Sequence, residues 1–315
     1  MTIQSGQTVD LTFGKETTYG SAIGGDVYTR IPYNSCSLSL TKSTQESNQL
    51  TGDRNVHDVF QGAHSVSGDI TFNLSHQAVF TEMFEAILGD HTASNGVIEV
   101  GSERASYTIH QAFTDLSTTK DNHQYVGCEF NSFSMTIPAD GLVECTVGVI
   151  GATMTSHDNR QDGTVSNFSD TNEPFHSSDC EITIDGRSTA LTTITELSLS
   201  IDNGIATTNR VGSDVPIQGG IGKCRVTGSM TAHFESTTLY EKFLDNNNFV
   251  DLTILVGASG GAETGILFDM SKVRITAGNV EIGGEGLVSV ALEFTALRND
   301  SNDQSTIQID TDLSS

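Results

Sequence analysis

The residue types that could do chemistry are present, but their spacing forms no catalytic or metal-binding pattern. Nine histidines are scattered, without an HExxH pair or another paired metal spacing. A GxSxG nucleophile elbow and a phosphate-binding loop are also missing from the sequence. The Asp-rich stretch 158–163 lacks the full spacing of an EF-hand loop. We therefore expect a protein that is not an enzyme, with no cofactor and no metal.

The cysteines and the apolar segments indicate where such a chain is made. Five cysteines, an odd number, occur singly without a CxxC spacing, which predicts reduced structural thiols formed in a cytosol. The first residues lack the basic segment and apolar core of a signal peptide. No apolar run approaches the roughly 20 residues of a membrane helix. We expect a soluble protein that is assembled inside a cell and does not contact a membrane.

The net charge of −25 comes from 40 acidic and 15 basic residues. Tight binding to nucleic acid depends on Lys and Arg contacts to phosphate, so this composition argues against it. A repulsive, polar wall would suit a conduit through which DNA passes. The charge fits equally well with a role in solubility or with adaptation to high salt.

Five matching segments in the same order predict a tandem duplication, with roughly 150 residues per copy. The clearest match is between 66–71 (VSGDIT) and 226–231 (VTGSMT). The other matched segments are 38–40 with 197–199, helix positions 80–84 with 240–244, 133–135 with 273–275, and 141–143 with 286–288.

Within each copy, the spacing of apolar residues predicts the elements that would position any functional side chain. From Val66 to Leu74, apolar and polar residues alternate with the period of a strand, and the second copy repeats this from Val226. A helical spacing follows each strand, and in the first copy it ends at Gly89. We expect a mainly β fold, in which each copy is a β-sandwich or barrel with one flanking α-helix.

Changes in composition predict the boundaries of the copies. The first domain would span 1–152 and the second 180–298. Between them, 153–179 has few apolar residues and no period, which is typical of a linker. The polar C-terminal tail, 299–315, would be flexible until assembly orders it.

A long polar segment lies between the first two strong strands of each copy, at 42–64 and at 202–222. Loops of this length are usually functional or disordered. Their matched position favours arms that reach a neighbouring subunit or ring, and mobile surface hairpins are the alternative. The charged residues that we expect at such contacts are Asp53, Arg54 and Asp58 in the first arm, and Arg210 and Asp214 in the second.

The exposed strand faces carry Ser, Thr and Asn, with few Lys–Glu pairs. Small hydroxyl residues suit any exposed strand, so an ordinary surface is one interpretation. The other is a sheet face that lines a pore. A chain with two equivalent halves could also build a six-unit ring from three copies.

Three stretches carry a resemblance to a known family: 14–20 (GKETTYG), 66–89, and 127–151, which begins GCEFNSFSMTIPADGLV and ends in VIG. Together they resemble the major tail tube proteins of long-tailed, siphovirus-like phages, in a tandem-duplicated form. The similarity covers most of the first half strongly and the second half more weakly. It rests on order and spacing, since none of these motifs is chemically specific.

This resemblance implies a structural virion protein whose inner sheet joins its neighbours into a barrel around a lumen. Trimeric, pseudo-hexameric rings would stack into a tube for DNA delivery, through which double-stranded DNA passes without tight binding. The implied partners are tape-measure, tail-tip and tail-terminator proteins, and the implied location is the virion tail after assembly in the host cytoplasm. The lumen-lining candidates are Ser67, Asp69, Thr71, Thr227, Ser229 and Thr231.

Two other functions are compatible with a β-sandwich. A surface binding module or adhesin would present aromatic platforms, but the chain has no Trp and only 7% aromatic residues. A hydrolase carried by the virion is disfavoured by the missing catalytic motifs.

Overall fold

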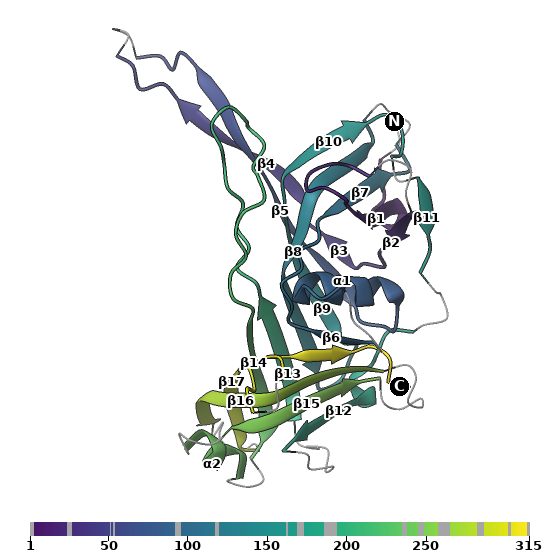
Figure 1. Cartoon of the computed structure of the whole chain (residues 1–315), viewed down its shortest axis with the longest axis vertical. Coiled ribbons are helices and arrows are strands. Elements are labelled where there is room, and N and C mark those ends of the chain that lie inside the picture. The colour runs from purple at the N-terminus through teal and green to yellow at the C-terminus, as the bar shows by residue number, and fades with distance from the viewer. Residues whose placement is uncertain are drawn as a thin grey trace.

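The structure is a computed structural model of the whole chain. It describes residues 3–313 with the exception of 24–26, 51, 53, 92–95, 117–119, 162, 169–172, 186–193, 235–237, 245–248, 258–264, 282–286 and 302–303. The fold is mainly β, with the two halves of the chain placed one above the other along the long axis (Figure 1).

In the described residues of the first half there are eleven strands and the helix α1. Its elements are β1 (Val9–Lys15), β2 (Val27–Arg30), β3 (Ser35–Cys36), β4 (Ser39–Glu46), β5 (Val59–Asn73), α1 (Ala78–Leu88), β6 (Val97–Glu99), β7 (Tyr107–Phe113), β8 (Asn122–Pro138), β9 (Glu144–Gly151), β10 (Thr153–His157) and β11 (Thr164–Ser166).

The part of the second half that the structure describes contains seven strands and the short helix α2. Its elements are β12 (Cys180–Ile184), β13 (Ile194–Asp202), β14 (Arg225–His233), α2 (Thr238–Leu244), β15 (Val250–Val256), β16 (Ile266–Glu281), β17 (Ser289–Ala296) and β18 (Gln308–Asp310). A 3₁₀ turn precedes β1 (Gly6–Thr8) and another precedes β12 (Ser177–Asp179).

One sheet runs through both halves, and we call it the shared sheet. Its strand order is β4-β5-β9-β8-β13-β14-β17-β16, and every neighbouring pair is antiparallel. A flanking sheet covers each half: β11-β2-β1-β7-β8-β10 in the first, and β12-β15-β16-β18-β6 in the second. The long strands β8 and β16 therefore belong to two sheets each, and they bend from one layer to the other.

The order of strands in the shared sheet is the same in both halves. In the first half it is β4-β5-β9-β8, and in the second β13-β14-β17-β16. The ladder between the last two strands shifts between Phe130 and Ser132 in β8, and between Ile275 and Ala277 in β16. Both shifts thus lie 145 positions apart (130 to 275, and 132 to 277).

The ladders correct two of the segment matches made from the sequence. Phe133 pairs with Val147 in β9, and the residue in the matching place opposite β17 is Gly278 rather than Val273. Likewise, the residue of β13 that corresponds to Leu38 is Leu199 rather than Leu197, because Leu199 lies opposite Gly228 as Leu38 lies opposite Gly68. A sequence comparison cannot see the shift, because the residues on both sides of it alternate in the same way.

Helix α1 covers the shared sheet, and its apolar side is buried. Its buried residues are Val79, Phe80, Met83, Phe84, Ile87 and Leu88, as their spacing predicts. Gly89 ends the helix in a left-handed conformation (φ 72°), and its N–H donates to the carbonyl of Glu85 at 2.8 Å. This confirms the predicted helix and its end.

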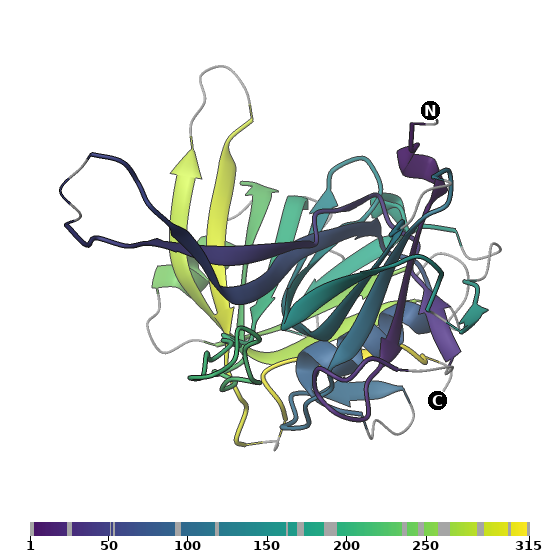
Figure 2. The same ribbon diagram turned by 90° about the horizontal axis from the view of Figure 1, so that it is seen from above.

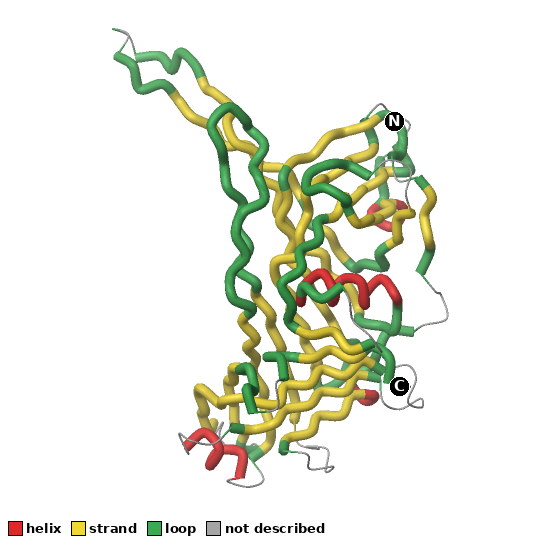
Figure 3. The backbone as a smooth tube through the Cα atoms, in the orientation of Figure 1, coloured by secondary structure: helices red, strands yellow, loops and turns green. Residues whose placement is uncertain are grey.

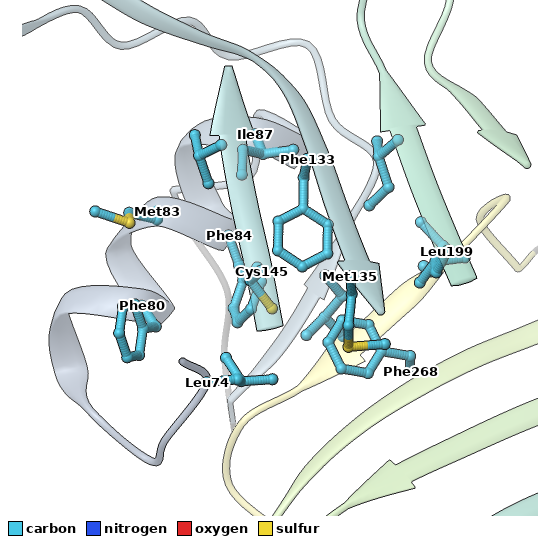
Figure 4. Close-up of a cluster of buried hydrophobic side chains, with 14 of the residues drawn as sticks. Leu74, Phe80, Met83, Phe84, Ile87, Phe133, Met135, Cys145, Leu199 and Phe268 are labelled. Carbon is cyan, nitrogen blue, oxygen red and sulfur yellow. The ribbon is translucent and has the colours of Figure 1, made fainter. Parts of the chain in front are cut away.

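The two halves share one hydrophobic core. Phe84 of α1 meets Phe133 of β8 edge to face, with ring centroids 5.4 Å apart, and meets Phe268 of β16 in the same way at 5.8 Å (Figure 4). Edge-to-face contacts of this kind stabilise beyond the area that they bury. Helix α1 of the first half therefore packs against strand β16 of the second half.

The segments expected to be a linker and a tail both contain strands. In 153–179, β10 pairs with β8, and β11 runs parallel to β2. In 299–315, β18 lies between β16 and β6, so it joins the second flanking sheet to a strand of the first half. Ile307 and Ile309 are fully buried there.

Among the described residues, none of the helices is long and apolar enough to cross a membrane.

Candidate assembly surfaces

One face of the shared sheet is polar, and it carries all six residues expected to line a lumen. Ser67, Asp69 and Thr71 alternate along β5 with the buried Val66, Ile70 and Phe72. In β14, Thr227, Ser229 and Thr231 alternate in the same way with Val226, Met230 and Ala232. These three apolar residues are buried in the core. The polar residues therefore share the opposite face.

Cross-strand pairing extends this face over both halves. Successive partners across six strands are all hydroxyl residues, namely Thr71, Thr146, Ser134, Ser200, Thr227 and Thr295. The hydroxyls of Thr71 and Thr146 lie 3.2 Å apart, and those of Ser198 and Ser229 lie 2.9 Å apart. The four members of this row outside β5 and β14 were not among the predicted residues, although their strands also alternate.

The joint between the halves is the ladder of β8 with β13. It runs from Ser132 opposite Asp202 to Pro138 opposite Glu196. Its apolar side chains are at most 5% exposed, and they are Phe133, Met135, Ile137, Leu197, Leu199 and Ile201. The joint is thus continuous with the core on one side and with the polar face on the other.

The second predicted arm, 202–222, lies along the first half of the same chain (Figure 3). It begins by extending the joint, because Asn203 N–H donates to the Asn131 carbonyl at 3.0 Å, and Ile205 N–H donates to Oδ1 of Asn131 at 2.6 Å. Further along, Asp214 meets His64 of β5 through a backbone hydrogen bond of 2.7 Å and a side-chain contact of 3.3 Å. Arg210 is exposed nearby.

An ion pair contacts the part of this arm that leads back to β14. Glu129 is almost completely buried, and it accepts hydrogen bonds from Arg104 at 2.7 Å and from Nε2 of Gln218 at 2.8 Å. Arg104 also donates to the carbonyl of Gly219 at 2.6 Å. Burial, followed by the nearby charge of Glu129, raises the pKa of Tyr19 to about 12. Sequence reasoning missed this site, since its members come from three distant segments.

The first predicted arm stands away from the body as a twisted hairpin built from the outer parts of β4 and β5 (Figures 1 and 2). Arg54 and Asp58 are exposed on it, whereas Asp53 lies outside the described residues. The arm also carries exposed apolar side chains, Leu50, Val56, Val59 and Phe60. Apolar groups gathered on a projecting segment are typical of a contact surface.

The shared sheet has two free edges in the part of the chain that the structure describes. At one edge β4 pairs with β5, and at the other the outer part of β16 pairs with β17. Unpaired strand edges are templates for pairing with another chain. A head-to-tail contact between the two edges would repeat around a ring.

Burial raises the pKa values of the thiols. All five cysteines are free, and burial is the main cause that raises the pKa of each thiol, to about 11 for Cys224 and about 12 for Cys180. Over the described ranges, no three His, Cys, Asp or Glu residues gather into a group that could hold a metal.

Comparison with known protein families gives a match over most of the chain. The family described as phage tail tube protein matches residues 6–296. A search of curated proteins found no match to the chain.

Proposed function

The chain belongs to the phage tail tube protein family, and on that premise we propose that three copies close into a ring with six similar units. The protein is a structural component of the virion tail that assembles with itself into a tube. The repeated strand order and the bulges 145 positions apart (130 to 275) support two equivalent units per chain. These two units would result from a tandem duplication.

The single observation that carries this proposal is the unbroken shared sheet. Within one chain, two units already join edge to edge through β8 and β13. A tube wall needs the same kind of joint repeated around an axis, and the free edges of β4 and β16 are available for it.

The polar face of the shared sheet would line the lumen. Its hydroxyl row offers small, uncharged side chains, and Asp69 and Glu293 add negative charge on the same face. DNA would pass such a wall without tight binding, because the chain as a whole carries a net charge of −25. Its further partners would be tape-measure, tail-tip and tail-terminator proteins, and assembly would take place in the host cytoplasm.

Electron microscopy of the purified protein at high concentration, together with the mass of the smallest ring, tests this function. We expect hollow tubes or stacked rings, with three chains in each ring. A protein that remains monomeric at high concentration would contradict the proposal. Rings of six chains would retain the tube but refute the pairing of two units per chain.

A further inference from the structure

We propose that Lys272 and Arg274 form a binding site for a carboxylate on the polar face of the second half. The carboxylate is that of Asp58, on the first arm of the next chain. The inference rests on the proposed function, because it needs a second copy of the chain beside the first.

Lys272 and Arg274 lie against one aromatic ring. The Nζ atom of Lys272 is 4.9 Å from the ring centroid of Phe249, and the guanidinium carbon of Arg274 is 4.6 Å from the same centroid. Neither cation forms an ion pair within the described part of the chain. Two positive charges beside one ring repel each other, and a negative charge between them would relieve this repulsion. The arrangement therefore favours an anion as its ligand.

The ladders place Arg274 on the polar face. It lies opposite Thr295, which lies opposite Thr227 of the hydroxyl row. The neighbouring Val273 and Ile275 are buried in the core, whereas Arg274 is exposed. The hydroxyl row of the shared sheet therefore ends in a cation.

The counterpart of Arg274 in the first half is Glu129. Glu129 lies opposite Ile150, which lies opposite Ser67, and Ser67 holds the place of Thr227. Glu129 and Arg274 are also 145 positions apart (129 to 274), as the bulges are. The same place in the two units thus carries opposite charges.

Inside the chain, an arm covers the place at Glu129. The second arm crosses it, and Nε2 of Gln218 donates to Glu129 at 2.8 Å. Arg104 supplies the opposite charge at 2.7 Å. Because the second arm belongs to the second unit, one unit here covers a site on the unit beside it. If the units repeat around a ring, the first arm of the next chain covers Arg274 in the same way.

Asp58 is the residue of the first arm that corresponds to Gln218. Counted back from the matched residues Val66 and Val226, both lie equally far along the chain (66 to 58, and 226 to 218). Asp58 is exposed on the projecting arm. An amide that donates to a carboxylate inside the chain is thus replaced, between chains, by a carboxylate that accepts from cations. The exchange of charge on the arm matches the exchange of charge on the sheet.

Apolar side chains accompany both partners. Val59 and Phe60 are exposed on the arm directly after the carboxylate. Phe249 and Leu297 are exposed beside the cations, and the N–H of Leu297 donates to the carbonyl of Lys272 at 2.8 Å. Contact between the two surfaces would bury these groups together with the ion pair, and burial makes such a pair less sensitive to salt.

Charge reversal tests the site. Arg274→Glu and Asp58→Arg, made singly, should each lower the yield of sedimenting tubes by roughly tenfold or more, because each places like charges opposite each other. The two changes combined should restore most of the yield. Both positions are exposed, so the melting temperature of the monomer should stay close to that of the parent. Lys223→Glu, which reverses an exposed cation on the other side of the second arm from Asp202, is the matched control and should assemble as the parent does.

Cross-linking with a carbodiimide, which joins an amine directly to a carboxylate, gives a second readout. In assembled tubes it should join Lys272 of one chain to Asp58 of another, and mass spectrometry of the digested protein identifies the joined peptides. Tubes mixed from isotopically light and heavy chains show that the link lies between chains. A link from Lys272 to a different carboxylate would refute Asp58 as the ligand.

Phosphate groups of DNA are the other anions that such cations could bind. Fluorescence anisotropy of a labelled double-stranded oligonucleotide, mixed with the dissociated chain at low salt, tests this alternative. We expect no binding, because the chain carries a net charge of −25. Binding that is lost in the double variant Lys272→Gln with Arg274→Gln would overturn the assignment to a carboxylate.

The outcomes separate the two proposals. If tubes form and both charge reversals assemble as well as the parent, the carboxylate site is wrong and the tube function stands. The same conclusion follows if each reversal weakens the tubes but their combination restores nothing. If the unmodified chain forms no tubes or rings, both proposals fail.

Discussion

Arg104 and Glu129 form an ion pair 2.7 Å long, with the Glu129 side chain only 4% exposed, beneath an arm that belongs to the other half of the chain. The ion pair therefore stabilises the contact between the two halves of the chain.

Replacing Arg104 with Ala leaves the Glu129 charge buried without its partner, and we expect a loss of about 3 kcal/mol in the free energy of unfolding. Urea denaturation followed by circular dichroism measures this loss. The double variant Arg104→Ala with Glu129→Gln should recover a large part of it, because the uncompensated charge is gone. Equal losses in both variants would show that packing, and not charge, is what Arg104 supplies.

Gly228 marks a place where strands approach too closely for a side chain. A Cβ there would meet the ring of Phe294 and the backbone carbonyl of Ser198. We expect Gly228→Ala to cost about 1–3 kcal/mol of stability, as overpacking generally does. Its matched control is Gly220→Ala, since nothing lies within 4 Å of a Cβ at that position. A thermal melt that does not distinguish the two variants would contradict the close approach.

Asp251 should destabilise the folded chain at neutral pH. Burial, followed by the charges of Asp269 and Asp185, raises its pKa above the ordinary value, and its Oδ1 is buried without a hydrogen-bond partner among the described residues. The folded state therefore binds a proton more readily than the unfolded state does, so its relative stability rises as the pH falls through the raised pKa.

The variant Asp251→Asn is consequently expected to melt at a higher temperature than the parent at pH 7. The difference should shrink as the pH approaches about 4, the ordinary pKa of aspartic acid. Glu46→Gln, at an exposed position on β4, serves as the control and should show no such dependence. A difference that persists unchanged at acid pH would rule out the charge as its cause.

Shortening the first arm tests whether this arm makes the contact between stacked rings. Replacing 47–58 by a short turn removes the exposed Leu50 and Val56 but leaves the core intact. We expect a folded chain that forms single rings and no tubes, as seen by electron microscopy. The unmodified chain, in which both arms are intact, is the control. Normal tubes from the shortened chain would exclude the arm as the stacking contact.

Local patterns predicted the strands, the helix α1 and the faces of the sheet, because alternation and helical spacing depend on neighbouring residues. The alternation around Ser67 places that residue correctly on the polar face, and Gly89 ends its helix as expected. The choice of partner strand could not be predicted in this way, since it depends on residues far apart in the sequence.

Two further features lay beyond sequence reasoning for the same reason. The bulge near Phe130 shifts one ladder, and no local pattern signals it. Strands of three residues, such as β11 and β18, are too short to show a period and read as polar loops. Their hydrogen bonds come from strands elsewhere in the fold, and this is why 153–179 and 299–315 looked unstructured.

The place of β18 in the sheet also imposes an order on synthesis. Strand β6 receives its partner from residues 308–310, so a ribosome must add the intervening residues before the strand edge at Ile98 is covered. At a rate of roughly 5–20 residues per second, this delay lasts on the order of 10–40 seconds. Until then Ile98 lacks its partner strand, so this contact between the two halves cannot form before residues 308–310 have been synthesised.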